Sequence, residues 1–293
     1  MKNIKYILGL FVLIGLFTGC EDDPESVIDN SAKPIVTVAS STTSISESGS
    51  PTFEVTINFD KPIKNTTTFV ATQIGGSASS GDFSSSPAVV PAYQTSATME
   101  ITVNDDIFVE GTEDVQLEIS ASNIPDIYEV VGKPTVSFSI ENSTSDDFIF
   151  RMDWDGLYED SNGNEHHFCD FDLDVELYDS SFNLLTASYS SCPEEIEISP
   201  GDLPDGDYWL VPSFWDVTTG VSPANYQDIP AVVTFVKPGI VLETIDLTTT
   251  WNTEDGGAIQ GNPDAYLFKY ILTVSGTNYK VTDSDTGTVV FQG

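Results

Sequence analysis

The chain of 293 residues carries 46 acidic residues against 10 basic ones, a formal net charge of −36. A field of that sign repels nucleic acid and anionic lipid surfaces, so no nucleic-acid partner is expected. Forty per cent of the residues are hydrophobic and 11% are aromatic, which excludes an intrinsically disordered chain. The length predicts two domains.

The N-terminus has the pattern of a secretory leader. After Lys2 and Lys5, residues 7–17 form an apolar run that is too short to cross a bilayer, which takes roughly 20 residues. A basic start followed by a short apolar core is typical of a signal peptide, predicted here over residues 1–19.

The leader ends in Phe17-Thr18-Gly19-Cys20. This tetrapeptide resembles the lipobox of bacterial lipoproteins, with Phe17 where Leu is usual. The resemblance implies that Cys20 becomes the first residue and carries a lipid, and stable anchoring needs two or more acyl chains. The alternative is an ordinary signal peptide that contains a cysteine.

Residues 20–35 are predicted to be a flexible acidic tether, because they are polar and include prolines at 24 and 34. The acids at 21, 22, 23 and 25 resemble the export signal of surface lipoproteins of the Bacteroidota. That resemblance implies a lipid-anchored protein of the outer membrane, facing the cell exterior. The alternative is a solvated tether, which is what most charge runs are.

The remaining chain is predicted to be all-β. Short runs of alternating apolar and polar residues, rich in Val, Ile, Thr, Phe and Tyr, are separated by turn residues, as at 52–59, 135–140 and 171–177. This spacing is typical of β-sandwiches. Because residues 141–147 are polar, two consecutive sandwiches (immunoglobulin-like or jelly-roll-like) are predicted, over 36–143 and 146–293.

Acidic residues recur at fixed spacing in the first predicted sandwich. Asp105 and Asp106 follow one predicted strand, and Glu110 and Glu113 lead into the next. With the turn around Glu47 and the small-residue loop that ends in Asp82-Phe83, the pattern resembles Calx-beta domains. These are immunoglobulin-like sandwiches found in sodium–calcium exchangers and in bacterial surface proteins.

The Calx-beta resemblance implies a Ca²⁺ site at one end of this sandwich. Clustered carboxylates repel one another unless a cation neutralises them, and Ca²⁺ takes about six to eight oxygen ligands. The matching ligands are Glu47, Asp82, Asp105, Asp106, Glu110 and Glu113.

The end of the last strand departs from the family pattern. Calx-beta domains are rich in aspartate there, whereas this chain has Glu141-Asn142. Glu141 or Asp146 could substitute for the missing carboxylates. The alternative is that the acidic loop only solvates one end of the sandwich.

Cys169 and Cys192 are predicted to form a disulfide, because Cys20 is taken by the lipid and the compartment is oxidising. A hairpin of residues 171–178 and 183–190, in which opposite positions sum to 361, would also place the two cysteines opposite each other. The rival is a thiol metal site with the adjacent histidines 166 and 167. It is disfavoured because the spacing fits no zinc pattern.

Three features of the second predicted sandwich bear on its role. Residues 160–165 predict a hairpin turn with Asn-Gly rather than an EF-hand, since Phe171 occupies the twelfth position. Residues 171–190 and 203–211 loosely resemble bacterial pre-peptidase C-terminal modules, which implies no catalytic residues. The aromatic candidates for stacking against sugars are Trp154, Trp209, Trp215, Trp251, Tyr208 and Tyr226.

No motif of a hydrolase or nucleotide-binding enzyme is present, and the two histidines lie side by side in a predicted turn. Paired carboxylates for glycoside cleavage remain open on composition alone. The sequence therefore predicts a non-catalytic lipoprotein of the cell surface, structural or adhesive, with bound Ca²⁺. The alternative is a glycan-binding accessory lipoprotein of a polysaccharide-uptake system; its partner would be an extracellular glycan or surface protein.

Overall fold

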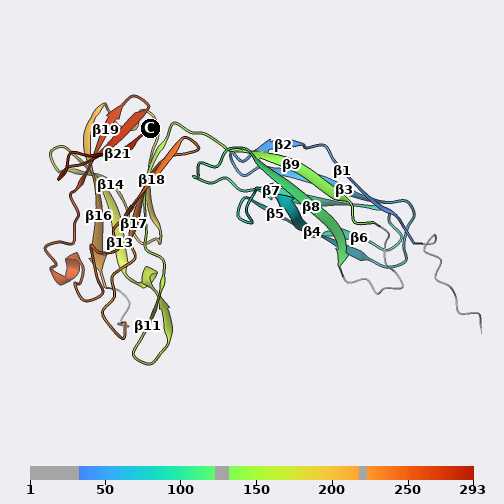
Figure 1. The fold of residues 1–293 in the computed structure, drawn as a ribbon, viewed down its shortest axis with the longest axis horizontal. Coiled ribbons are helices and arrows are strands. Elements are labelled where there is room, and N and C mark those ends of the chain that lie inside the picture. The colour runs from blue at the N-terminus through green and yellow to red at the C-terminus, as the bar shows by residue number, and fades with distance from the viewer. Residues whose placement is uncertain (1–32, 123–131, 218–222) are drawn as a thin grey trace, which may run out of the picture.

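The computed structural model describes residues 33–122, 132–217 and 223–293, and strands dominate all three ranges. Two hydrophobic cores form, one from residues before 141 and one from residues after 147, and they share no residue. We call these parts the first and the second module (Figure 1). The prediction of an all-β chain built of β-sandwiches is confirmed. No helix in the described ranges has the length and apolar character needed to cross a membrane.

The first module packs two sheets face to face, with strand orders β1-β3-β7-β5 and β2-β9-β8-β4-β6. Alternate side chains of β3 and β7 point into the core, as the period of two predicts. Its strands are β1 (Val36–Ser40), β2 (Ser44–Ser46), β3 (Thr52–Phe59), β4 (Thr67–Gly76), β5 (Phe83–Ser85), β6 (Ala88–Val90), β7 (Ser96–Val103), β8 (Glu113–Ser122) and β9 (Thr135–Glu141).

The second module packs a four-stranded sheet, β15-β10-β17-β18, against a six-stranded sheet, β14-β13-β16-β19-β20-β21. Its strands are β10 (Phe148–Asp153), β11 (Leu157–Glu159), β12 (Glu165–His167), β13 (Asp172–Asp179), β14 (Leu184–Ser188), β15 (Glu194–Ile198), β16 (Gly206–Asp216), β17 (Val232–Lys237), β18 (Val241–Asp246), β19 (Tyr270–Ser275), β20 (Asn278–Asp283) and β21 (Val289–Gln292).

Aromatic residues fill the core of the second module. Trp154 and Trp251 are buried, and their indole N–H groups donate to the carbonyls of Phe171 at 3.0 Å and Asp264 at 3.1 Å. A buried tryptophan with its polar atom satisfied in this way is a core residue. These two tryptophans are therefore not accessible for stacking against a sugar, and buried Tyr208 is not accessible either.

The connection between the modules is held by the turn that joins β17 to β18. The Ser145 N–H donates to the Pro238 carbonyl at 3.1 Å, and the Lys237 ammonium pairs with Asp146 at 3.0 Å. Gly239 has a φ of +65°, and a Cβ there would lie 1.8 Å from the Ser143 carbonyl oxygen. The linker thus lies directly against the second module.

The predicted disulfide between Cys169 and Cys192 is present, with the Cα atoms 5.6 Å apart. The hairpin register that suggested it is wrong by two residues. Val175 pairs with Ser188, so opposite positions sum to 363. Both cysteines lie outside the paired strands, in a 3₁₀ turn and in the loop before β15. Loop packing, rather than strand pairing, brings them together.

The turn predicted at residues 160–165 joins β11 to β12. An Asp160 carboxylate oxygen accepts from the backbone N–H groups of Asn162 and Asn164, and Gly163 adopts a φ of +79°. Asp side chains favour such turns because they replace the missing backbone partners. The prediction of an Asn-Gly hairpin is confirmed.

Candidate metal centre

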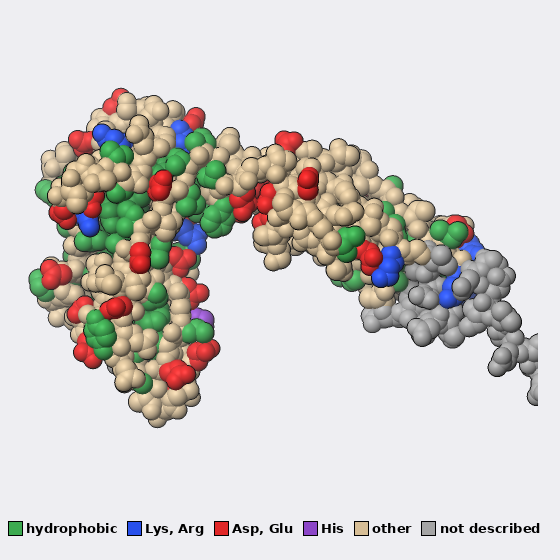
Figure 2. Space-filling view, in the orientation of Figure 1, with side chains coloured by type: hydrophobic (Ala, Val, Ile, Leu, Met, Phe, Trp, Pro, Cys, Tyr) green, Lys and Arg blue, Asp and Glu red, His purple; other side chains and the backbone are tan. Residues whose placement is uncertain are grey.

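Acidic side chains gather at the end of the first module that faces the second (Figure 2). We call the six predicted ligands the loop cluster. Five of them form two trios, in each of which one carboxylate oxygen per residue lies within 4.8 Å of the others. Glu110 belongs to both trios, which are Glu47, Asp106 and Glu110, and Asp82, Glu110 and Glu113.

Three loops supply these side chains. The loop between β7 and β8 carries Asp106 and Glu110, and Glu113 opens β8. Glu47 follows β2 in a tight turn, where its N–H donates to the Glu141 carbonyl at 3.1 Å. Asp82 precedes β5, and its carbonyl accepts from the Asn104 N–H at 2.8 Å. The sandwich topology places all three loops at one end.

Asp105 belongs to neither trio. One of its carboxylate oxygens accepts from the Gly49 N–H at 2.8 Å, and the other accepts from the Ser143 hydroxyl at 2.9 Å. These two bonds tie the Glu47 turn and the linker to the β7–β8 loop. In this geometry Asp105 positions the loops around the cluster.

Neutral groups lie beside the loop cluster directly after β9. The Ser143 N–H donates to Glu47 at 2.7 Å, and the Asn142 side-chain oxygen accepts from the Glu110 N–H at 3.4 Å. The side chain of Glu141 instead accepts from Ser44, and Asp146 pairs with Lys237. Neither substitute enters the trios. Sequence reasoning missed Asn142 and Ser143 because neutral residues carry no metal-ligand signal.

Burial and repulsion raise the pKa values of several cluster acids. Glu47 is 3% exposed; burial raises its pKa, and the charges of Asp106, Asp105 and Glu110 raise it further against one backbone hydrogen bond from Ser143. Burial likewise raises the pKa of Glu110, with the charge of Asp106 next. All the charged neighbours that shift these two pKa values are carboxylates.

Asp82 and Glu113 share a hydrogen bond, and their pKa values are shifted in opposite directions. Burial, then the hydrogen bond with Asp82, raises the pKa of Glu113 to about 7. Burial also raises the pKa of Asp82, but hydrogen bonds from Glu113 and Ser79 outweigh it and the pKa lies below its ordinary value. Glu113 therefore holds the proton of this pair until a cation or a base removes it.

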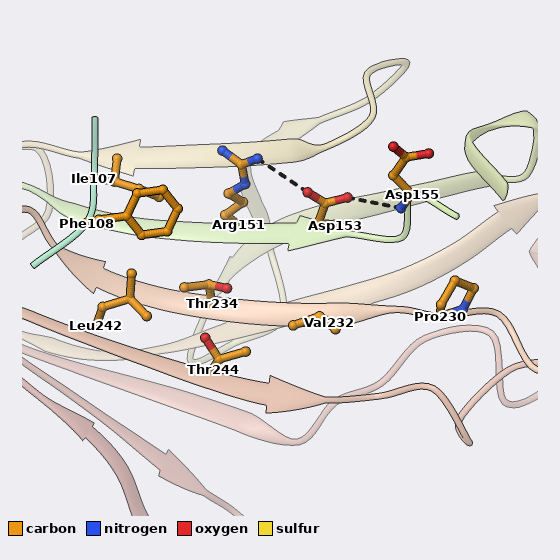
Figure 3. A pocket seen from close by; sticks show the side chains of 10 residues that line it. All are labelled: Ile107, Phe108, Arg151, Asp153, Asp155, Pro230, Val232, Thr234, Leu242 and Thr244. Carbon is orange, nitrogen blue, oxygen red and sulfur yellow. Dashed lines mark hydrogen bonds and ion pairs between the residues drawn. The ribbon is translucent and has the colours of Figure 1, made fainter. Parts of the chain in front are cut away.

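The β7–β8 loop also faces the second module. Ile107 and Phe108 form one wall of a hollow of about 330 Å³, and the outer faces of β10, β17 and β18 form the other (Figure 3). Arg151 lies on that second wall and pairs with Asp153 at 3.3 Å. The loop that carries Asp106 and Glu110 is thus part of the contact between modules.

No protein-family model matches the sequence, and no curated protein matches it, so the resemblance to Calx-beta domains stays a prediction. Solved structures are similar at low identity. A two-domain protein of unknown function from Bacteroides fragilis NCTC 9343 is 9% identical with a TM-score of 0.32, over 68% of this chain and 92% of that one.

Two solved CBD12 structures are also similar. CBD12 from CALX1.2 is 12% identical with a TM-score of 0.31, over 69% of this chain and 79% of that one. The calcium binding domain CBD12 of CALX1.1 is 12% identical with a TM-score of 0.27, over 61% of this chain and 80% of that one. Similarity at this level carries no argument about function.

Proposed function

We propose that the first module binds Ca²⁺ at the loop cluster. The observation that carries this is the pair of carboxylate trios that share Glu110, each with its oxygens within 4.8 Å. Hard oxygen ligands from several loops suit Ca²⁺, which accepts irregular geometry, better than Mg²⁺, which demands a near-ideal octahedron. Burial and then repulsion between carboxylates raise the pKa values of Glu47 and Glu110, and a cation offsets that repulsion.

The test compares two variants of purified residues 21–293. Titration calorimetry should show Ca²⁺ binding, and the melting temperature should rise with millimolar Ca²⁺ and fall with chelator. A ligand at 100 times its Kd stabilises by about 2.7 kcal/mol. Glu110→Gln, which touches both trios, should lose most of this response. Glu54→Gln, exposed on β3 and outside both trios, is the matched control. An equal Ca²⁺ response in both variants would sink the assignment.

We further propose that a lipid on Cys20 anchors the chain in the outer membrane, facing outward. Cys20 and the tether as far as residue 32 lie outside the described residues, so the support is the leader pattern alone. Cys20→Ser should move the protein from the membrane fraction to the soluble fraction after export. Surface display is checked by protease treatment of intact cells.

The role that fits an anchored chain of two sandwiches is structural or adhesive, without catalysis. One observation favours the glycan-binding alternative: Trp215 and Tyr226 are 37% and 56% exposed. Exposed aromatic faces are where sugars stack. A glycan array with the native chain and with Trp215→Ala decides between the two roles. Binding signals that are lost in the variant would favour glycan binding. No signal with any polysaccharide would exclude the glycan-binding role.

A further inference from the structure

The outer face of the six-stranded sheet in the second module is acidic and yet buried. Along β13, Leu173, Val175 and Leu177 point into the core, so Asp174 and Glu176 point the other way. A polar row of this kind is normally solvated. Here Asp174 is only 2% exposed and Glu176 only 4%.

A segment distant in sequence contributes aromatic side chains next to this row. The Phe214 N–H donates to the Ala265 carbonyl at 2.9 Å, and the Leu267 N–H donates to the Pro212 carbonyl at 3.0 Å. The chain before β19 therefore runs beside β16, and Tyr266 bridges to Ser213. Aromatic side chains form a connected wall over the acids, through the ring contacts Tyr178–Phe268, Trp209–Phe268, Phe182–Trp209, Phe182–Phe268 and Tyr266–Phe268.

Two polar atoms beneath this wall have no hydrogen-bond partner among the described residues. They are one carboxylate oxygen of Asp174 and the hydroxyl of Ser213. The two residues are directly paired across β13 and β16, so their side chains share the outer face. A buried polar group without a partner is destabilising, because it has lost its hydrogen bonds to water and gained none. Both atoms keep the capacity to accept a hydrogen bond.

The other polar groups of this face are already engaged. The hydroxyl of Tyr189 donates to Glu176 at 2.9 Å, and that of Tyr178 donates to its second oxygen at 2.5 Å. Glu194, which belongs to β15 of the other sheet, is engaged as well and accepts from the Ser188 hydroxyl and the Ser191 N–H. A ligand would therefore meet Asp174 and Ser213 as its open partners.

The carboxylates of this face favour a positively charged ligand. Burial, then the charges of Asp172, Glu194 and Glu176, raises the pKa of Asp174 to about 8. Burial and the charges of Glu176 and Asp174 raise the pKa of Tyr266 as well. All the charged groups that shift these two pKa values are carboxylates.

The chemistry of the site selects among ligands. In the described residues, carboxylate trios close enough for a metal occur only in the first module. A neutral sugar would leave the repulsion between these carboxylates in place. An ammonium or guanidinium group offsets the charge, donates hydrogen bonds to carboxylate and hydroxyl oxygens, and is attracted to aromatic faces.

We propose that Asp174, Ser213 and the aromatic wall, together with Tyr189, form a binding site for a small organic cation with N–H donors. Tyr189, half exposed and bonded to Glu176, is the ring that the ligand displaces on entry. The bound cation holds Asp174 in its ionised form. The proton of that carboxyl group leaves to solvent as the complex forms.

The experiment uses residues 21–293 and a matched pair of probes, 1,5-diaminopentane and 1,5-pentanediol. Calorimetry at pH 7 in two buffers of different ionisation heat measures both affinity and proton release. The diamine should bind with release of close to one proton, the diol should not bind, and affinity for the diamine should rise from pH 6 to pH 8. Tryptophan fluorescence, to which Trp209 contributes, follows the same titration.

Asp174→Asn should weaken diamine binding at least tenfold and abolish proton release. Phe268→Ala removes part of the exposed wall and should weaken binding in a chain that still folds, which guards against a folding defect in the first variant. Glu243→Gln, exposed on β18 of the other sheet, is the control and should bind normally. Equal binding of the diol, no heat with the diamine, or Ca²⁺ binding that survives Glu110→Gln but not Asp174→Asn would overturn the proposal.

Discussion

Glu113 and Asp82 share a hydrogen bond in the loop cluster, and this contact governs how the first module responds to pH. The pKa of Glu113 is raised to about 7 in the folded chain. Its bound proton therefore stabilises the cation-free fold fully below the unfolded pKa, near 4.5, and that stabilisation is lost as the pH rises to 7. Asp82, whose pKa is lowered, acts in a separate and more acidic range.

Glu113→Gln should reduce the dependence of the free energy of unfolding on pH. We expect the cation-free variant to be more stable than the native chain at pH 8 by about 1 kcal/mol, a figure reduced for solvent screening. Urea denaturation between pH 4 and pH 8, in chelator, measures it. Two parallel profiles would contradict the assignment of the proton to Glu113.

Gly239 is the residue on which the linker contact depends. Its φ is +65°, and a Cβ would meet the Ser143 carbonyl oxygen at 1.8 Å. Gly239→Ala should therefore cost about 2 kcal/mol or more, from both strain and displacement of the linker. Gly163→Ala, at a φ of +79° with open space around it, should cost only about 1 kcal/mol. Thermal denaturation compares the two, and equal losses would show that the backbone angle alone matters.

At the scale of elements, the disulfide closes a loop that holds the hairpin of β13 and β14. Cys169 and Cys192 are 23 residues apart, and closing a loop of this size stabilises by roughly 3 kcal/mol. The double variant Cys169→Ser/Cys192→Ser should lower the melting temperature of the second module and leave that of the first unchanged. A fall in both transitions would mean that the modules do not unfold separately.

Strand positions could be predicted from sequence because the period of two is local. The run at 52–59 is β3 without change, and 171–177 differs from β13 by two residues or fewer at each end. The loop cluster was also predicted, since acids at fixed spacing fall on loops that a sandwich brings to one end. Five of the six predicted ligands meet there.

Contacts between distant segments could not be predicted in the same way. Along β13 the sequence shows an ordinary polar face, yet in the folded chain Asp174 is only 2% exposed and residues 265–267 lie beside β16. The disulfide was predicted from compartment chemistry, while its geometry depends on loops that have no periodic signal. Periodicity reports which side of a strand is polar, and it does not report what covers that side.

On the scale of the whole molecule, the separate cores predict two unfolding transitions. The two cores share no residue, so each module can lose its structure by itself. Calorimetric scans should resolve two peaks, of which Ca²⁺ shifts only the one that belongs to the first module. The disulfide variant assigns the other peak to the second module, because it should lower the temperature of that peak alone. A single peak that moves with both treatments would show that the linker contacts couple the modules.

The pairing of β2 with β9 has a mechanical consequence. These strands are parallel, from Ser44 opposite Ser139 to Ser46 opposite Glu141. One lies near the start of the first module and the other at its end, so tension along the chain pulls them in opposite directions. Their hydrogen bonds are then loaded together in shear, not opened one by one. Glu47 directly follows β2 and accepts a hydrogen bond from Ser143, just after β9. A cation bound at Glu47 would therefore strengthen the pairing of β2 with β9 at the end where the linker applies the force.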